Sequence, residues 1–197
     1  MTLGPGLEQI IRKDDYVMVE LNCTPERFES CFSKMEFLTS YGYMKKVAEE
    51  SGIQTFSYIL PDSIYSGDDL SFQGYLQERG VMHSHRGTTK MEKKFEEDFS
   101  LMATRKKKKL SSMSIFSEIE SIKGAGKKNL IFSGFNTEVD IMFNVMCAAD
   151  LGFVPVVLSD GVSSPWELRH FNALEAMSRY SYIMDSRDVM EIKGDHL

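Results

Sequence analysis

The chain has 197 residues, of which 42% are hydrophobic, and a net charge of −6, which allows one substantial core. The acidic balance, with a pI near 5.3, argues against a protein that binds nucleic acid through its overall charge. No apolar run has the length of a membrane span, and the N-terminal sequence does not have the pattern of a signal peptide. Three cysteines without a paired spacing favour free thiols. We therefore predict a cytoplasmic protein with no membrane partner.

The first part of the chain predicts a β-α-β unit. Tyr16–Glu20 is a short apolar run with two valines, which is typical of a buried strand. Apolar residues at spacings of three and four predict a helix over about 35–51, and Gly52 supplies its end. A second strand is expected at Thr55–Leu60, closed by Pro61.

The segment 61–113 is the least regular part of the chain. It holds turn signals, a charged stretch at 90–99 with the pattern of a solvated helix face, and the basic run Arg105–Lys109. No linker rich in proline or serine marks a second domain. We therefore expect one domain over residues 1–197, with 61–113 as an elaborated loop region over a sheet edge.

Regular alternation returns after this segment. Successive apolar runs and helical spacings predict a helix at Ser114–Lys123, a strand at Asn129–Ser133, a helix at Thr137–Leu151, a strand at Phe153–Leu158, a helix at Pro165–Arg179 and a strand at Tyr180–Met184. Pro155 removes one donor from its strand, so that strand is expected near an edge or to be irregular. Repeated β-α-β units predict an α/β fold, a mostly parallel sheet with helices on both faces.

Polar residues follow four of the predicted strands. They occur at Glu20–Asn22, Pro61–Asp62, Gly134–Asp140 and Ser159–Asp160. In an open parallel sheet, ligands bind beyond the carboxyl ends of the strands. We expect any functional site to lie there.

The sequence from Asn129 to Ser164 resembles the C-terminal half of the isochorismatase-like cysteine hydrolases. That family has an apolar strand, G-x-x-T-x-x-C at a helix start, a helix ending in D-x-G-[YF], and a strand ending in D-x-x-x-S. The matching positions here are Gly134, Thr137, Asp150, Gly152, Phe153, Asp160 and Ser164. The resemblance continues to about residue 190 and is weaker upstream, at 16–22 and 83–88. It implies a three-layer α/β/α fold and a homo-oligomer, a dimer or tetramer.

The resemblance also implies the positions of a catalytic centre. In the family a cysteine attacks an amide, ester or vinyl-ether substrate, assisted by an aspartate and a lysine. The cysteine position is Asp140 here, and the aspartate position is Glu20. An insertion leaves the register of the lysine position open, so any of the four lysines at 106–109 can occupy it, and Lys106 and Lys109 are taken as its representatives. By the same resemblance, the substrate-binding positions are Asn22, Phe135, Asn136 and Thr137.

Asp140 has three interpretations. With Thr137 it forms a capping-box-like pair at a helix start. It could instead share a ligand or metal site with Glu20, or act as a nucleophilic carboxylate. Glu20 follows apolar residues and needs a partner if buried, so a structural Glu–Lys pair is its plain alternative. A carboxylate is a poorer nucleophile for amides than a thiolate, and neither Cys23 nor Cys147 lies where it could replace one.

The remaining polar motifs are less informative. His83 and His85 have a spacing that can hold a metal, but the family's Asp-x-His motif is absent after Asp62. Exposed loop histidines or substrate contacts are the alternatives, and we predict no metal and no cofactor. His170 is interpreted as a helix-face residue that packs near the end of the sheet.

Two functional hypotheses follow. The first is a diverged isochorismatase-like protein that has lost cysteine-hydrolase chemistry and binds a small ligand or has a structural role. The second is a hydrolase of a small amide or ester in which Glu20, a lysine of the basic run and Asp140 take rearranged roles. A nucleic-acid adaptor that uses the basic run is disfavoured by the acidic remainder of the chain.

Overall fold

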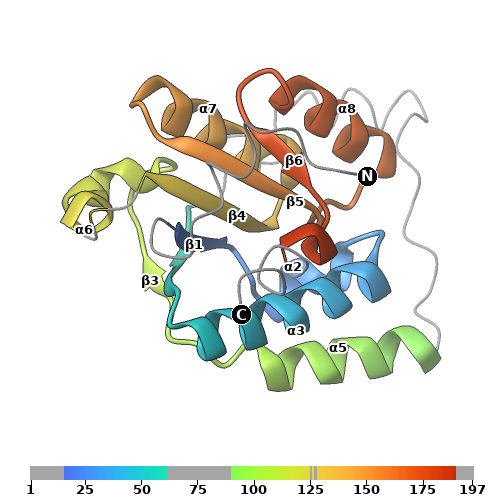
Figure 1. Cartoon of the computed structure of the whole chain (residues 1–197). Helices are drawn as coiled ribbons and strands as arrows, with labels where there is room; N and C mark the ends of the chain where they lie inside the picture. The colour runs from blue at the N-terminus through green and yellow to red at the C-terminus, as the bar shows by residue number, and fades with distance from the viewer. Residues whose placement is uncertain (1–15, 62–89, 125, 127, 190–197) are drawn as a thin grey trace.

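The computed structural model describes residues 16–61, 90–124, 126 and 128–189, and these form an α/β/α sandwich (Figure 1). The six strands are β1 (Tyr16–Leu21), β2 (Gln54–Ile59), β3 (Lys108–Lys109), β4 (Asn129–Phe135), β5 (Val154–Ser163) and β6 (Tyr182–Met184). They lie in the order β3-β2-β1-β4-β5-β6, and every pairing is parallel. The predicted fold class is confirmed.

Helices cover both faces of this sheet. They are α2 (Pro25–Ser30), α3 (Lys34–Ser51), α5 (Lys90–Met102), α6 (Ile119–Gly124), α7 (Met142–Asp150) and α8 (Glu167–Met177). Figure 1 shows α2, α3 and α5 on one side of the sheet and α7 and α8 on the other. A 3₁₀ turn at Ile115–Glu118 leads into α6, and a π-helical turn at Thr137–Ile141 leads into α7.

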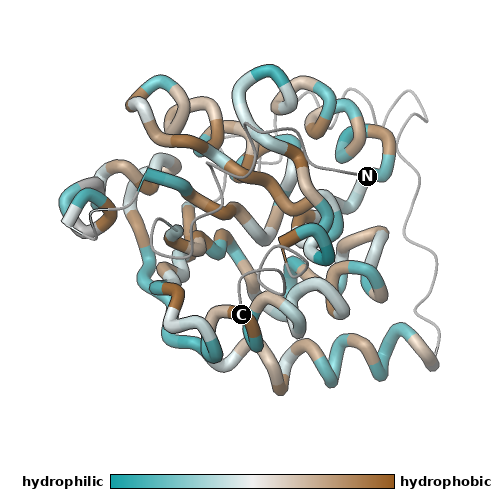
Figure 2. The backbone as a smooth tube through the Cα atoms, in the orientation of Figure 1, coloured by the Kyte–Doolittle hydropathy of each residue, from teal (hydrophilic) through white to brown (hydrophobic). Residues whose placement is uncertain are grey.

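Strand β1 has no solvent-facing side, because all six of its residues are buried. Val17, Val19 and Leu21 join the core formed with α6, α7 and α8. Tyr16 and Met18 alternate with them and pack on the other face, against α3. The hydrophobic colour of the central strands in Figure 2 reflects this burial on both faces, which is expected of a covered parallel sheet.

A cluster of aromatic rings packs between the sheet and the helices that cover one of its faces. Phe28 stacks on Phe99 with centroids 4.3 Å apart, and Phe37 lies 4.3 Å from Phe135. These rings come from α2, α5, α3 and β4, so four elements share one contact region. Aromatic pairs of this kind add about 0.5–1.5 kcal/mol beyond the burial of their area.

Several elements differ in detail from the predictions. Gly52 ends α3 in a left-handed conformation (φ 66°), as its position indicated. Strand β5 is longer than expected, with a shift in its register to β4 beyond Val157. It lies next to the edge strand β6, whose pairing starts at Val156 and does not reach Pro155. Within 61–113, residues 90–102 form α5, whereas residues 62–89, including His83 and His85, lie outside the described part.

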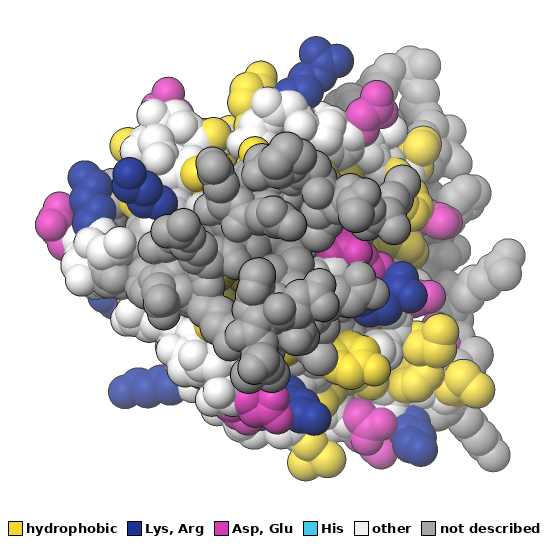
Figure 3. All heavy atoms as spheres, in the orientation of Figure 1, with side chains coloured by type: hydrophobic (Ala, Val, Ile, Leu, Met, Phe, Trp, Pro, Cys, Tyr) yellow, Lys and Arg dark blue, Asp and Glu magenta, His cyan; other side chains and the backbone are white. Residues whose placement is uncertain are grey.

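Charged side chains of both signs are interspersed on the face seen in Figure 3. Among the described residues, no helix is both long enough and apolar enough to cross a membrane.

Candidate functional site

The turn between β4 and α7 is the centre of the candidate site. Gly134 pairs with Leu21 of β1 and has φ 124°, a conformation that favours glycine. The peptide bond between Phe135 and Asn136 is cis. Asn136 is the N-cap residue, and its carbonyl accepts the N–H of Ile141 at 3.1 Å across the π-helical turn. The chain therefore passes directly from a buried strand into a helix start at the sheet's carboxyl edge.

The Asp140 carboxylate turns back onto this helix start. Its Oδ2 accepts the backbone N–H of Asn136 at 2.9 Å, and the residue is only 3% exposed. Burial raises the pKa of Asp140, although the Asn136 N–H, Arg27 and the Asn22 amide act to lower it. Asp140 therefore caps the helix start through its side chain, because its carboxylate accepts the backbone N–H of the N-cap residue Asn136.

The Thr137 hydroxyl does not complete a capping box. Its Oγ1 lies 2.8 Å from Nδ1 of His170 on α8. Burial lowers the pKa of His170 to about 4, so the imidazole is neutral at physiological pH. The rings of Phe32 and Phe171 pack edge-on against it, with centroids 5.1 and 5.0 Å away. The hydrogen bond between Thr137 and His170 thus connects the turn to α8. The two residues are 33 positions apart, and no motif in the sequence predicts this contact.

Glu20, at the end of β1, is a buried carboxylate with few partners. It is 1% exposed, and neither of its oxygens accepts a hydrogen bond from the described residues. Arg105 lies nearest as a countercharge, with its Nε 3.8 Å from Oε1, which is too long for a hydrogen bond. Burial raises the pKa of Glu20, and Arg105, the Ser57 hydroxyl, Lys107 and Lys45 lower it.

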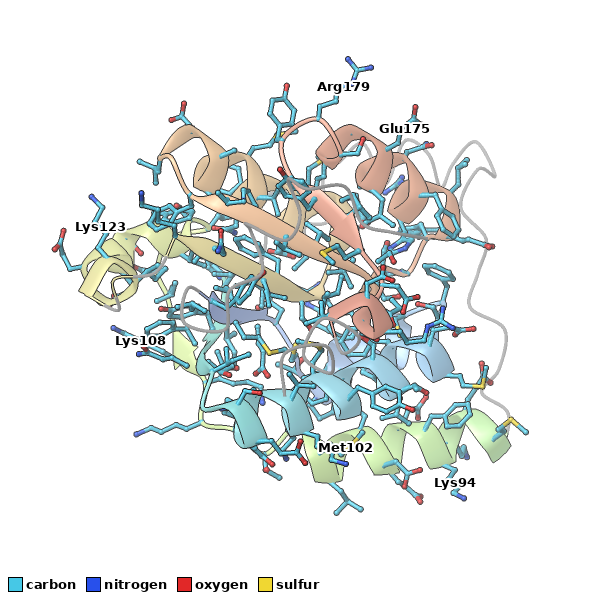
Figure 4. The ribbon with its side chains drawn as sticks, viewed as in Figure 1. Lys94, Met102, Lys108, Lys123, Glu175 and Arg179 are labelled. Carbon is cyan, nitrogen blue, oxygen red and sulfur yellow. The ribbon has the colours of Figure 1, made fainter. Side chains whose placement is uncertain are left out.

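The countercharge of Glu20 is Arg105, the first residue of the basic run. Lys106 and Lys109 are exposed, whereas Lys107 is half-buried and its Nζ donates to the carbonyl of Ala103 at 2.7 Å. Lys108 pairs with Glu118 on the 3₁₀ turn before α6, and Figure 4 shows it on the same side of the view as Lys123. The two lysines chosen for the family position therefore form no ion pair with Glu20 in the structure.

The predicted substrate-binding positions have different surroundings. Asn22, in a left-handed conformation (φ 52°), accepts the N–H of Leu60 through Oδ1, while its Nδ2 has no acceptor among the described residues. The Phe135 ring is fully buried in the aromatic cluster, so only its backbone borders the turn. The Oδ1 of Asn136 accepts no hydrogen bond within the described part of the chain.

The three cysteines are free, and two of them, Cys23 and Cys31, are buried. Cys23 is buried beside Glu20, and burial together with that carboxylate raises the pKa of its thiol well above the ordinary value. Burial raises the pKa of Cys31 to about 12. The pKa of Cys147, inside α7, is raised by burial and by Asp150. All three thiols are thus held in the protonated form, which is the unreactive form.

Sequence reasoning did not single out four polar residues that surround the two acids. Arg105 and Ser57 act on Glu20, Arg27 acts on Asp140, and Glu138 lies in the same turn as Asp140. Burial also raises the pKa of Glu138, with Asp140 contributing. Within the described residues, no group of three or more histidine, cysteine or carboxylate side chains is arranged to hold a metal.

Comparisons with known proteins agree with this architecture. Among curated proteins, none matches the chain. The structure is similar to MAR1 ribonuclease from Caenorhabditis elegans, with a TM-score of 0.64 and 13% identity over 93% of this chain and 84% of that one. It is also similar to an isochorismatase-like hydrolase from Alkaliphilus metalliredigens, with a TM-score of 0.59 and 13% identity over 91% and 98% of the two chains. For a pyrazinamidase/nicotinamidase from Streptococcus mutans the TM-score is 0.55, with 15% identity over 86% and 99%.

Identities this low establish the shared fold alone. The family assignment comes from the sequence, because residues 66–188, more than half of the chain, match the model of the isochorismatase domain. The chain therefore belongs to the isochorismatase family.

Proposed function

We propose that this family member has lost cysteine-dependent hydrolysis and binds a small molecule beyond the carboxyl ends of β1 and β4. The observation that carries the proposal is the hydrogen bond from the Asn136 N–H to the Asp140 carboxylate. Asp140 stands where the family resemblance implies the nucleophile, yet its side chain is buried and folded back on the chain's own backbone. A group held in this way is poorly placed to attack a bound substrate.

The chemistry of the thiols supports the loss of hydrolysis. Nucleophilic attack on an amide needs a thiolate or an equally activated group. The carboxylate of Asp140 is a weaker nucleophile toward amides, and the raised pKa values of Cys23, Cys31 and Cys147 disfavour a thiolate at each of them.

Unsatisfied polar atoms support the binding of a ligand. The buried Glu20 oxygens accept no hydrogen bond from the described residues, and the buried Asn22 Nδ2 donates none to them. Leaving such groups unpaired is unfavourable by about 1–3 kcal/mol each, and by more when they are charged. A small molecule that offers both N–H or O–H donors and an acceptor would satisfy them.

Turnover assays test the loss of chemistry. We expect no turnover of isochorismate, nicotinamide or simple amides and esters by the wild type. Asp140→Cys should gain activity if the residues around this position still support catalysis by a thiolate, and the same substitution at exposed Asp150 is the matched control. Wild-type turnover that disappears in Asp140→Ala but survives Cys23→Ala and Cys147→Ala would show that the proposal is wrong.

A ligand screen by thermal shift tests the binding. Compounds that stabilise the wild type should lose their effect on Glu20→Gln, because the carboxamide offers one acceptor where the carboxylate offers two. If no compound stabilises the wild type, a structural role is favoured.

One observation favours a second function, a hydrolase with a Glu20, lysine and Asp140 centre. Burial raises the pKa of both carboxyls, and perturbed carboxyls of this kind are typical of general acids and bases. The same substrate panel separates the two functions, because this enzyme would turn over substrate without any cysteine.

We also propose a cytoplasmic location and a homo-oligomeric state. Free cysteines are the usual condition of a reducing compartment, and family membership supports a dimer or tetramer. Cell fractionation and sedimentation velocity test the two proposals, and a monomer at all concentrations would contradict the second.

A further inference from the structure

We propose that Ser111 is a phosphorylation site for a protein kinase that selects basic residues on the N-terminal side of its acceptor serine. Ser111 follows the basic run Arg105–Lys109 and one leucine, so lysines stand two and three positions before it. The inference does not depend on the proposed function, because it concerns the segment that follows β3 at the end of the described sheet and not the turn at Asp140.

Ser111 differs from the neighbouring serines because its hydroxyl is free. The Ser112 Oγ accepts the N–H of Ser114 at 3.1 Å, and the Ser114 Oγ accepts the N–H of Phe116 at 3.2 Å, at the start of the 3₁₀ turn. The Ser117 hydroxyl donates to the carbonyl of Ser114 at 3.0 Å. Ser111 is exposed, and its hydroxyl has no hydrogen-bond partner among the described residues. It can therefore receive a phosphoryl group without the loss of a contact that holds the fold.

The segment before Ser111 is extended and lies at an end of the described sheet. Strand β3 pairs with β2 on one side, at Tyr58 and Ile59, and the N–H of Leu110 donates to the carbonyl of Ile59 at 2.9 Å. An extended segment presents successive side chains to opposite sides, so a groove that binds the backbone can contact several of them at once. Because few hydrogen bonds hold so short a strand, its local release should cost much less than global unfolding.

The lysines before Ser111 carry charge that the fold leaves available. Lys106 and Lys109 are exposed and form no ion pair within the described ranges. Lys108 pairs with Glu118, yet its side chain remains 58% exposed, and Figure 4 shows it at the periphery of the molecule. An exposed basic segment on a chain with a net charge of −6 is complementary to an acidic groove and is repelled by a basic one. This complementarity selects the class of kinase.

The reaction is the transfer of the γ-phosphoryl group of ATP to the Ser111 hydroxyl. A bond forms between Oγ and the γ-phosphorus, while the bond from that phosphorus to the oxygen that bridges to the β-phosphate breaks. ADP leaves, and the hydroxyl proton passes to a base of the kinase. The product carries a charge of about −1.5 to −2 at Ser111, and Lys109, two positions away and without an ion pair, is available to it. Phosphorylation therefore offsets part of the positive charge of the basic run.

Treatment of the folded full-length protein with ATP and each of two purified kinases tests the proposal. The catalytic subunit of cAMP-dependent protein kinase has an acidic substrate groove, and we expect it to phosphorylate Ser111, as mapped by mass spectrometry. Casein kinase II, which selects acidic segments, should leave Ser111 unmodified. Ser111→Ala should abolish the modification of this segment. Ser112→Ala should retain it, because the Ser112 hydroxyl is already engaged in the fold.

Replacement of the lysines tests their role in recognition. Lys108→Gln combined with Lys109→Gln should lower the rate of Ser111 phosphorylation by at least about tenfold, because two charges that face the groove are lost. The matched control is Lys123→Gln combined with Lys128→Gln, the same change of charge at exposed positions outside the segment, and it should keep the wild-type rate. If the first variant does not fold, Lys108→Glu alone replaces it and should lower the rate at least as much.

Four results would overturn the proposal. They are no modification of Ser111 by the first kinase, an equal rate with casein kinase II, an unchanged rate after the lysines are replaced, and modification of Ser112 as fast as that of Ser111. The last result would mean that the kinase acts on unfolded chains, because only there are both hydroxyls equally free.

Discussion

His170 should make the stability of the fold fall as the solution becomes acidic. The residue is 3% exposed, and burial lowers the pKa of His170 from 6.5 to about 4. As the pH drops, the unfolded chain therefore takes up the proton before the folded chain does. The contribution of His170 is fully present above about pH 6.5 and is lost as the pH falls toward about 4.

The pKa difference sets the size of this effect. Each unit corresponds to about 1.4 kcal/mol, so the full loss is roughly 3 kcal/mol, and about 2 kcal/mol of it falls between about pH 8 and about pH 5. Glu20, Glu138 and Asp140 act in the opposite direction, because burial raises their pKa values and the folded chain binds their protons first. If the wild type is compared with a variant that lacks only His170, the contributions of these acids are the same in both proteins, and the difference in stability reports the histidine.

Urea unfolding of the wild type and of His170→Asn across this pH range provides the measurement. Asparagine can still bond the Thr137 hydroxyl, but it does not titrate. The variant should be less stable than the wild type at high pH, and the gap should narrow by about 2 kcal/mol at about pH 5. Asn172→Ala, at an exposed position of α8, should run parallel to the wild type. A gap between wild type and His170→Asn that does not change with pH would refute this reasoning.

Three further substitutions test the packing and the buried charge. Gly134→Ala should lower the free energy of unfolding, measured in urea, by at least about 3 kcal/mol. The reason is that φ is 124° and an added Cβ would overlap the carbonyl oxygen of Leu21. A free energy of unfolding within about 0.5 kcal/mol of the wild type, the usual scatter of surface substitutions, would contradict this. Phe99→Ala, at a fully buried ring, should lower the free energy of unfolding by about 3–5 kcal/mol, whereas exposed Leu101→Ala should change it little; equal effects would refute the role of the aromatic cluster. Glu20→Gln should stabilise the fold near neutral pH, because it removes a buried carboxylate that burial disfavours in its charged form. The gain should shrink on acidification, because the folded wild type then protonates Glu20 and no longer buries a charge there. A gain that grows at low pH would contradict the burial argument.

The sheet and its main helices could be predicted because burial leaves a local pattern. Strand β4 is a continuous apolar run, and α3 shows its buried residues at spacings of three and four. Helix α2 has only six residues and no such period, and its start rests on the Thr24 hydroxyl. Strand β3 consists of two lysines whose strand conformation depends on pairing with Tyr58 and Ile59. Neither element could be read from local sequence.

The position of the site could be predicted from the sequence, but the contacts among its residues could not. Family spacing and the end of β4 together point to Asp140, and the end of β1 points to Glu20. The contacts of these acids depend on geometry that the spacing does not contain. Arg105 reaches Glu20 across 85 positions of sequence, and the Asp140 carboxylate reaches the Asn136 N–H across a π-helical turn that has no sequence signature.

The lysine pair of β3 also has a consequence for behaviour at high concentration. Both residues are exposed, and they form the end of the described sheet beyond β2. A strand from another molecule that approached this edge would find only two residues to pair with, and both carry lysine side chains, of which Lys108 is paired with Glu118. Short, lysine-bearing edges of this kind oppose the growth of a sheet into an aggregate. We expect replacement of Lys108 and Lys109 by threonine to lower the solubility of the protein, without any change at Asp140 or Glu20.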